Sequence, residues 1–157
     1  MKRLLFLGST VADVILRTPG LPRTGEDVNL LGQSVSLGGC AYNACRAAML
    51  LYPRTGVTLL SPVGSGLWGD WVHQAPTAEG LAENLPRTDE ANGCCYCLVE
   101  PDGERTFLCQ HGAEYRFRRE WLTRLGDMGF DSAYLCGLEV EEDTGDVLLD
   151  YLEQHPP

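Results

Sequence analysis

The sequence lacks the long apolar segments that mark membrane and exported proteins. No stretch of the 157 residues approaches the ~18–20 consecutive apolar residues that a membrane-spanning helix needs. The apolar run near the first residue, Leu4-Leu5-Phe6-Leu7, is shorter than a signal-peptide core, and no small-residue cleavage site follows it at the right distance. We therefore expect neither a membrane partner nor export.

Basic residues are also scarce. The sequence has 22 Asp and Glu against 12 Lys and Arg, which gives a formal net charge of -10 at pH 7. An acidic chain repels the phosphate backbone of nucleic acids and the surface of anionic lipids. We expect no nucleic acid among its partners.

Cysteine is present, but its spacing matches no common metal site. The seven cysteines stand at positions 40, 45, 94, 95, 97, 109 and 136. An odd number without an export signal favours reduced thiols, and hence a cytoplasmic location. Cys94 and Cys97 form one C-x-x-C, but residues three apart on a strand face opposite sides, and no second pair completes four ligands. Zinc is therefore the weaker interpretation.

The order of apolar segments and turns predicts an α/β fold. Residues 3–8 and 57–60 are short apolar runs typical of buried strands. Residues 41–51, rich in Ala and Leu and free of internal Gly and Pro, predict a helix between them. A strand, a helix and a strand in this order imply a parallel βαβ unit.

The remaining segments continue this alternation. The stretch 18–32 is rich in turn residues and predicts a loop with a short strand, and 67–85 is predicted to be partly helical. Asp143 is predicted to cap the last helix. Near the end of the chain we expect a short helix at 119–125, a strand at 132–136 and a helix at about 144–154 with a buried stripe of Val147, Leu148, Tyr151 and Leu152.

Residues 93–100 and 105–110 form the clearest hairpin in the sequence. The Asp102-Gly103 pair in their link supplies the positive φ angles of a tight turn. Counting outward from that turn pairs Tyr96 with Cys109 and Leu98 with Phe107, which makes one face of the hairpin apolar. That face needs another part of the protein to cover it.

Two glycine-containing motifs are candidates for ligand binding. Asp13 ends the motif Gly8-Ser9-Thr10-Val11-Ala12-Asp13 after the first strand, and α/β sheets bind ligands beyond the ends of their strands. Gly38-Gly39 precede the helix that contains Asn43, and their missing side chains allow a ligand to approach the first backbone N–H groups. Structural roles remain alternatives for these residues, as a loop cap for Asp13 and a helix-entry turn for the glycines.

Taken in order, such motifs make the chain resemble the ribokinase-like, or PfkB, family of carbohydrate and nucleoside kinases. The resemblance covers essentially the whole chain and matches the N-terminal half of the family. The elements that carry it are the strand ending in Gly8-Ser9 with Asp13, the turn with Pro22, Gly25 and Glu26, Gly38-Gly39 with Asn43, Gly64 with Gly69, the Asp102-Gly103-Glu104 hairpin, and Leu138-Glu139.

The resemblance implies a three-layer α/β core with a parallel-type central sheet and a small β lid. The lid would be built from approximately residues 14–37 and 93–112. Residues 1–157 would be the substrate-binding part of such a domain, with the nucleotide-binding half and its catalytic aspartate absent. In the family the lid closes over the sugar and often mediates dimer contacts, so a homodimer through the lid is an expected option.

The resemblance also assigns roles to individual residues. Asp13 would accept hydrogen bonds from substrate hydroxyls, and Asn43 would bind another hydroxyl. The Gly38-Gly39 turn would let the backbone approach the substrate. Glu139 would contact the substrate or order the site, although its acidic neighbours also fit a solvated loop before a helix.

The implied activity is transfer of the γ-phosphate of ATP, with Mg²⁺, to a hydroxyl of a sugar or nucleoside. Val11 and Glu114 replace amides that ribokinases carry, which argues against ribose itself. Phosphoryl transfer depends on positioning and charge stabilisation at the nucleotide, so this chain alone is expected to be inactive. The alternative is a non-catalytic sugar-binding protein or a truncated homologue completed by a partner. A Rossmann-like nucleotide domain is disfavoured, because the later glycines of G-x-G-x-x-G are missing.

Overall fold

A parallel sheet of three strands lies at the centre of the protein. The computed structural model describes residues 2–77, 81, 84–126 and 128–156. The strand order is β4-β1-β9, with β1 (Arg3–Leu7) between β4 (Gly56–Leu60) and β9 (Ser132–Leu135). Both pairings are parallel, which confirms the βαβ unit predicted from the sequence.

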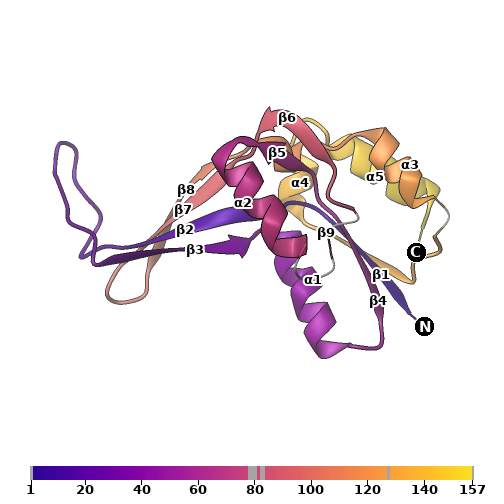
Figure 1. Ribbon diagram of the computed structural model, residues 1–157, viewed down its shortest axis with the longest axis horizontal. Coiled ribbons are helices and arrows are strands. Elements are labelled where there is room, and N and C mark those ends of the chain that lie inside the picture. Colours follow the sequence, from indigo (N-terminus) through magenta and orange to yellow (C-terminus); the bar gives the residue numbers. More distant parts are fainter. Residues whose placement is uncertain (1, 78–80, 82–83, 127, 157) are drawn as a thin grey trace.

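Helices cover both faces of this sheet, because successive side chains of β1 point to opposite sides. Phe6 packs with α1 and α2 on one face, whereas Leu5 and Leu7 pack with α3 and α5 on the other. The result is the three-layer α/β core that the family resemblance implied (Figure 1). The helices are α1 (Cys40–Leu51), α2 (Gly66–Thr77), α3 (Arg119–Leu125), α4 (Gly137–Glu141) and α5 (Gly145–Gln154).

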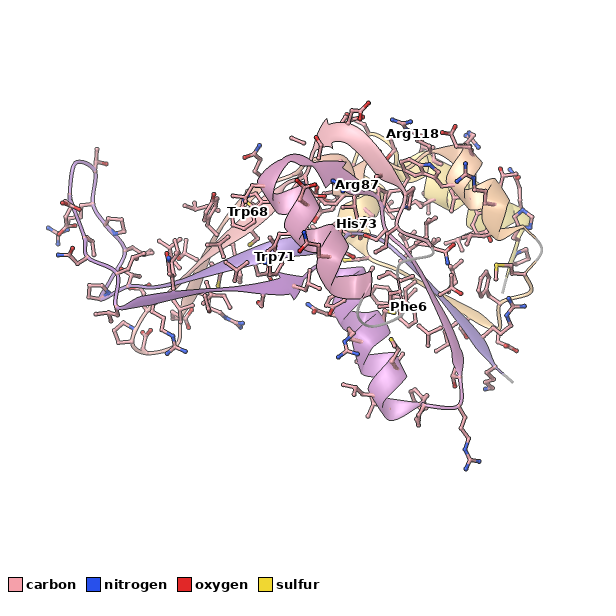
Figure 2. All side chains as sticks on the ribbon, viewed as in Figure 1. Phe6, Trp68, Trp71, His73, Arg87 and Arg118 are labelled. Atoms are coloured by element: carbon pink, nitrogen blue, oxygen red, sulfur yellow. The ribbon has the colours of Figure 1, made fainter. Side chains whose placement is uncertain are left out.

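A second sheet, in the order β3-β2-β7-β8, projects from the core toward the left of Figure 1. One of its faces packs against the core through Ala12 and Cys94. Figure 2 labels Trp68 and Trp71 on α2 at the base of this sheet, where both pack against the same cluster. The strands are β2 (Val11–Arg17), β3 (Gly32–Gly38), β7 (Cys94–Val99) and β8 (Arg105–Gln110).

The β7–β8 hairpin is present, but its predicted register is wrong by one residue. The sequence count paired Tyr96 with Cys109, whereas the structure places Cys95 opposite Cys109 and Tyr96 opposite Leu108. Because side chains alternate along a strand, a shift of one residue changes which side chains meet across the hairpin.

The loop between β7 and β8 explains this difference. The Glu100 N–H donates to the Glu104 carbonyl at 3.0 Å, and the Gly103 N–H donates to the Glu100 carbonyl at 3.0 Å. Residues 101–103 therefore form the loop, with Gly103 at φ 91. This is the odd-numbered hairpin loop with a left-handed glycine, not the two-residue turn that the Asp-Gly pair suggested.

The last helix is capped differently from the prediction. Thr144, not Asp143, is its N-cap residue, and no side chain caps it. The Thr144 hydroxyl accepts the Phe117 N–H and donates to the Tyr115 carbonyl, both at 2.9 Å. Asp143 pairs with Arg116 at 2.8 Å, so the predicted Asp143 cap is wrong. The buried stripe is confirmed, since Val147, Leu148, Tyr151 and Leu152 pack in one cluster.

Several elements escaped the sequence analysis. Strand β5 (Val63–Ser65) pairs in parallel with β6 (Arg87–Ala91), and α4 occupies the segment expected to be a loop. Part of the stretch 67–85 lies outside the described residues. Within the ranges that the structure describes, no helix combines the length and apolar character needed to cross a bilayer.

Candidate functional site

The predicted glycine motifs meet where the two sheets join. Strand β1 ends at Leu7, and Gly8, Ser9 and Thr10 link it to β2. Strand β3 runs antiparallel to β2 and returns Gly38 to a position opposite Val11. The glycine pair before α1 therefore lies beside the loop that follows β1.

The Asp13 carboxylate lies against Gly38. Asp13 is the third residue of β2, whereas the sequence analysis placed it in a loop. A Cβ atom added to Gly38 would overlap the Asp13 carboxylate, so the missing side chain provides the space that this carboxylate occupies. Partial burial raises the pKa of Asp13 above its ordinary value.

Gly39 brings the start of α1 close to the backbone of Ser9. It is the N-cap of α1 and has φ 98, a conformation that L residues rarely adopt. A Cβ atom at this position would overlap the Ser9 carbonyl. Both the backbone angle and the close approach therefore require glycine here.

Glu139 is a buried member of the same junction. It lies on α4 with 1% of its surface exposed, which excludes the solvated-loop alternative. Its Oε1 atom accepts hydrogen bonds from the Ser9 N–H and the Ser9 hydroxyl, both at 2.9 Å. Among the described residues, no group bonds to the buried Oε2 atom. Glu139 thus fixes the Ser9 loop and retains one unused acceptor in the interior.

Cys40 lies within the electrostatic influence of both carboxylates. Burial, a hydrogen bond with Cys136, and the negative charges of Glu139 and Asp13 raise the pKa of Cys40 to about 11. The thiol therefore stays protonated at neutral pH. Sequence analysis did not identify this residue, because a cysteine at the start of an Ala-rich helix resembles an ordinary core residue.

Tyr115 was missed for a similar reason. It belongs to the 3-10 helix η2 (Ala113–Tyr115) and is buried. Burial is the main cause that raises its pKa to about 12, with a contribution from the Glu139 charge and an opposing effect of a hydrogen bond with Ser9. Its hydroxyl is therefore a neutral group beside Ser9. Only the preceding Gly112-Ala113-Glu114 motif pointed to this segment in the sequence.

Glu114 holds together the two ends of the β7–β8 hairpin. The Gly93 N–H donates to its Oε2 atom at 2.8 Å, and the Gly112 N–H donates to its Oε1 atom at 2.9 Å. Glu114 is fully buried, and this burial raises the pKa of its carboxyl. The carboxylate therefore fixes the base of the hairpin from within the core.

Asn43 lies apart from the other candidates. Its backbone N–H bonds the Gly39 carbonyl at 2.9 Å in the first turn of α1, and its side chain is exposed. The structure thus brings together Asp13, Gly38, Gly39 and Glu139, and leaves Asn43 at the exposed edge of the junction.

The described residues offer no cluster suited to a metal ion. No group of three His, Cys, Asp or Glu side chains within them could hold one. Cys94 packs into the core cluster, whereas Cys97, three residues later on β7, faces the other side of the sheet.

Comparison with known proteins agrees with the fold and the motifs. The family model described as pfkB family carbohydrate kinase matches residues 1–154. The "Uncharacterized sugar kinase YegV" of Escherichia coli (strain K12) is 37% identical over 150 residues, which are 96% of this chain and 46% of that protein. The chain thus spans about half the length of this relative.

Solved structures show the same architecture. The ribokinase of Giardia lamblia superposes with a TM-score of 0.84 at 18% identity, over 98% of this chain and 50% of that chain. The ribokinase of Cryptococcus neoformans var. grubii serotype A, in complex with ADP, superposes with a TM-score of 0.63 at 26% identity, over 74% of this chain and 36% of that chain. The fold is therefore ribokinase-like.

Proposed function

Because the chain belongs to the pfkB family of carbohydrate kinases, we propose that residues 1–157 form the sugar-binding part of such a kinase. Segments 14–37 and 93–112 act as its lid, and the nucleotide-binding half lies outside this chain. The observation that carries the proposal is the junction of the two sheets, where the Asp13 carboxylate lies beside Gly38. The unused Oε2 acceptor of Glu139 is a second feature of this junction.

Each residue of the junction suits the recognition of a polyhydroxylated ligand. The Asp13 carboxylate accepts hydrogen bonds from sugar hydroxyls, and charge-assisted bonds of this kind are the stronger ones. Gly38 and Gly39 keep the adjacent backbone free of side chains, so a sugar ring can approach it. Asn43 binds a further hydroxyl at the exposed edge, and Glu139 orders the Ser9 loop or accepts a hydroxyl at Oε2.

The reaction in this proposal is transfer of the γ-phosphate of ATP, with Mg²⁺, to a hydroxyl of a sugar or nucleoside. It is supported by the family and by the sugar kinase YegV, which the chain resembles over 150 residues. The ADP complex of the Cryptococcus ribokinase supports an adenine nucleotide as the donor. The alternative is a protein that binds a sugar without turning it over, or a truncated homologue completed by a partner.

Two further expectations belong to the same proposal. A homodimer through the lid is supported by exposed apolar side chains on the lid strands, namely Val35, Tyr96, Phe107 and Leu108. A cytoplasmic location is supported by the seven cysteines, which are all free thiols.

Calorimetric titration of the chain with a panel of monosaccharides and nucleosides tests the proposal. We expect one class of ligand to bind, and Asp13→Asn to weaken its binding about tenfold, as the loss of one charge-assisted bond implies. Asp102→Asn, at the exposed hairpin turn, is the matched control and should leave the affinity unchanged. Equal affinity of Asp13→Asn and the original chain would show that Asp13 is not a ligand contact.

The pH dependence of binding provides a second check on Asp13. Because burial raises its pKa, the carboxylate becomes protonated at a higher pH than an exposed aspartate. Binding should therefore weaken as the pH falls through this raised pKa, and Asp13→Asn should not show that loss.

A further inference from the structure

Two thiols face each other across the β7–β8 hairpin. Cys95 on β7 stands directly opposite Cys109 on β8, and their Sγ atoms are 3.4 Å apart. The loop at 101–103 brings them together, because the register expected for a two-residue turn would place Tyr96 opposite Cys109. This cysteine pair is separate from the thiols of Cys40 and Cys136 at the junction.

The backbone geometry of the pair suits a disulfide. Glu100 and Glu104 share a ladder hydrogen bond, and pairs along an antiparallel ladder alternate between bonded and non-bonded types. Counting from Glu100, Cys95 and Cys109 form a non-hydrogen-bonded pair, whose Cα atoms are about 4.5 Å apart in such ladders. Disulfides span Cα distances of roughly 4.4–6.8 Å, so the bond can close without moving the strands apart.

Exposure distinguishes the two thiols. Cys109 is exposed on β8, which is the edge strand of its sheet, whereas Cys95 is partly buried. Burial, followed by the hydrogen bond and the charge of Cys109, raises the pKa of Cys95 to about 12. An oxidant in solution therefore reaches Cys109 first, with Cys95 behind it as the second thiol.

The pair also lies beside the candidate sugar site. In the parallel pairing of β2 with β7, Asp13 stands opposite Cys95. Residues directly opposite each other share a face of a sheet, so Asp13, Cys95 and Cys109 form one row across three strands. A bond between the two thiols would join β8 covalently to β7 next to Asp13.

We propose that Cys95 and Cys109 form an oxidant-sensitive dithiol that closes to a disulfide with hydrogen peroxide and reopens with small thiols. The Cys109 sulfur attacks one peroxide oxygen, so an S–O bond forms and the O–O bond breaks, giving a sulfenic acid and water. The Cys95 sulfur then displaces the sulfenic oxygen. The S–S bond forms as the S–O bond breaks, and the Cys95 proton leaves with that oxygen as a second water. Both sulfurs are oxidised and the peroxide is reduced.

Peroxide treatment of the purified chain, followed by alkylation and mass spectrometry, tests this proposal. We expect two of the seven thiols to escape alkylation, with the loss of two hydrogens in the intact mass, and full recovery after reduction. The linked peptides should be those containing Cys95 and Cys109. Because Cys94 and Cys97 accompany Cys95 in a peptide, Cys95→Ser and Cys109→Ser should each abolish the link.

Cys136→Ser is the matched control and should keep the link, because it removes a thiol from the junction and not from the hairpin. Circular dichroism of each variant before oxidation establishes that it is folded, and Cys109→Ala provides a second replacement at the exposed position. Alkylation of both Cys95 and Cys109 after peroxide treatment would overturn the proposal, as would a link that joins other cysteines or two chains. The experiment uses neither sugar nor ATP, so its failure would leave the proposed function untouched.

Discussion

The two oxygens of Glu139 make different contacts, and this difference gives a sharp prediction for two substitutions. Oε1 accepts both the N–H and the hydroxyl of Ser9, whereas Oε2 is buried without a partner among the described residues. Glu139→Ala removes the acceptor of both bonds. Glu139→Gln retains an oxygen at the position of Oε1 and replaces the unused oxygen by an amide.

The expected destabilisation follows from the burial of Ser9. Ser9 is fully buried, so in the alanine variant its N–H and hydroxyl lose the acceptor that they have in the folded protein. Each buried donor left unsatisfied costs about 1–3 kcal/mol, which gives about 2–6 kcal/mol for the two Ser9 donors. This is a large part of the ~5–15 kcal/mol that stabilises a typical domain. The glutamine variant keeps both Ser9 bonds in neutral form, and its cost of about 1–3 kcal/mol comes from the amide N–H groups placed at the unpartnered Oε2 position, so it should be destabilised less than the alanine variant.

Urea denaturation followed by circular dichroism measures both free energies of unfolding. Glu141→Ala is the matched control, since Glu141 lies on the same helix and is exposed; we expect a change within about 0.5 kcal/mol. If Glu139→Ala destabilised the protein no more than Glu141→Ala, the Ser9 bonds would not hold the junction together. A destabilisation by Glu139→Gln equal to that by Glu139→Ala would contradict the argument that the oxygen retained at the Oε1 position holds the Ser9 loop.

Two further predictions concern the surroundings of the site. Gly38→Ala should displace the Asp13 carboxylate and abolish sugar binding measured by calorimetry. Gly137→Ala is the control and should leave binding unchanged, because its added Cβ would meet no atom within 4 Å. Equal binding by the two variants would contradict the assigned contact between Gly38 and Asp13. Burial raises the pKa of Glu114 above its ordinary value of 4.5. At pH values between 4.5 and this raised pKa, the Glu114 carboxyl is protonated in the folded chain and ionised in the unfolded chain. Stability in urea should therefore fall as the pH rises through this interval, and this slope should be smaller in Glu114→Gln; identical slopes would refute the argument.

Local apolar patterns were enough to predict the core elements. Helix α3 begins and ends where the sequence predicted, at Arg119 and Leu125. Strands β1, β4 and β9 were found because they are short apolar runs bounded by turn residues. Each of these elements is marked by residues that are close together in the sequence, so it could be predicted without knowledge of distant contacts.

The features that the sequence left open or predicted wrongly depend on distant contacts or on loop geometry. Glu139 is buried and bonds Ser9, a partner 130 positions away, and nothing in its acidic neighbours distinguishes it from a solvated residue. The hairpin register depended on whether the Gly103 loop has two or three residues, which the Asp-Gly pair does not determine. The sequence made Asp143 a reasonable candidate for the N-cap, but in the folded protein its carboxylate forms an ion pair with Arg116.

The most direct test of the central claim is a nuclear magnetic resonance titration of the isotope-labelled chain with the sugar or nucleoside that binds in calorimetry. Binding at the junction predicts that the amide signals of Ser9, Gly38 and Gly39 shift together as the ligand is added, and that Asp13→Asn reduces these shifts. Signals that shift only in other parts of the chain, with these three amides unchanged, would contradict the assignment of a sugar site to this junction.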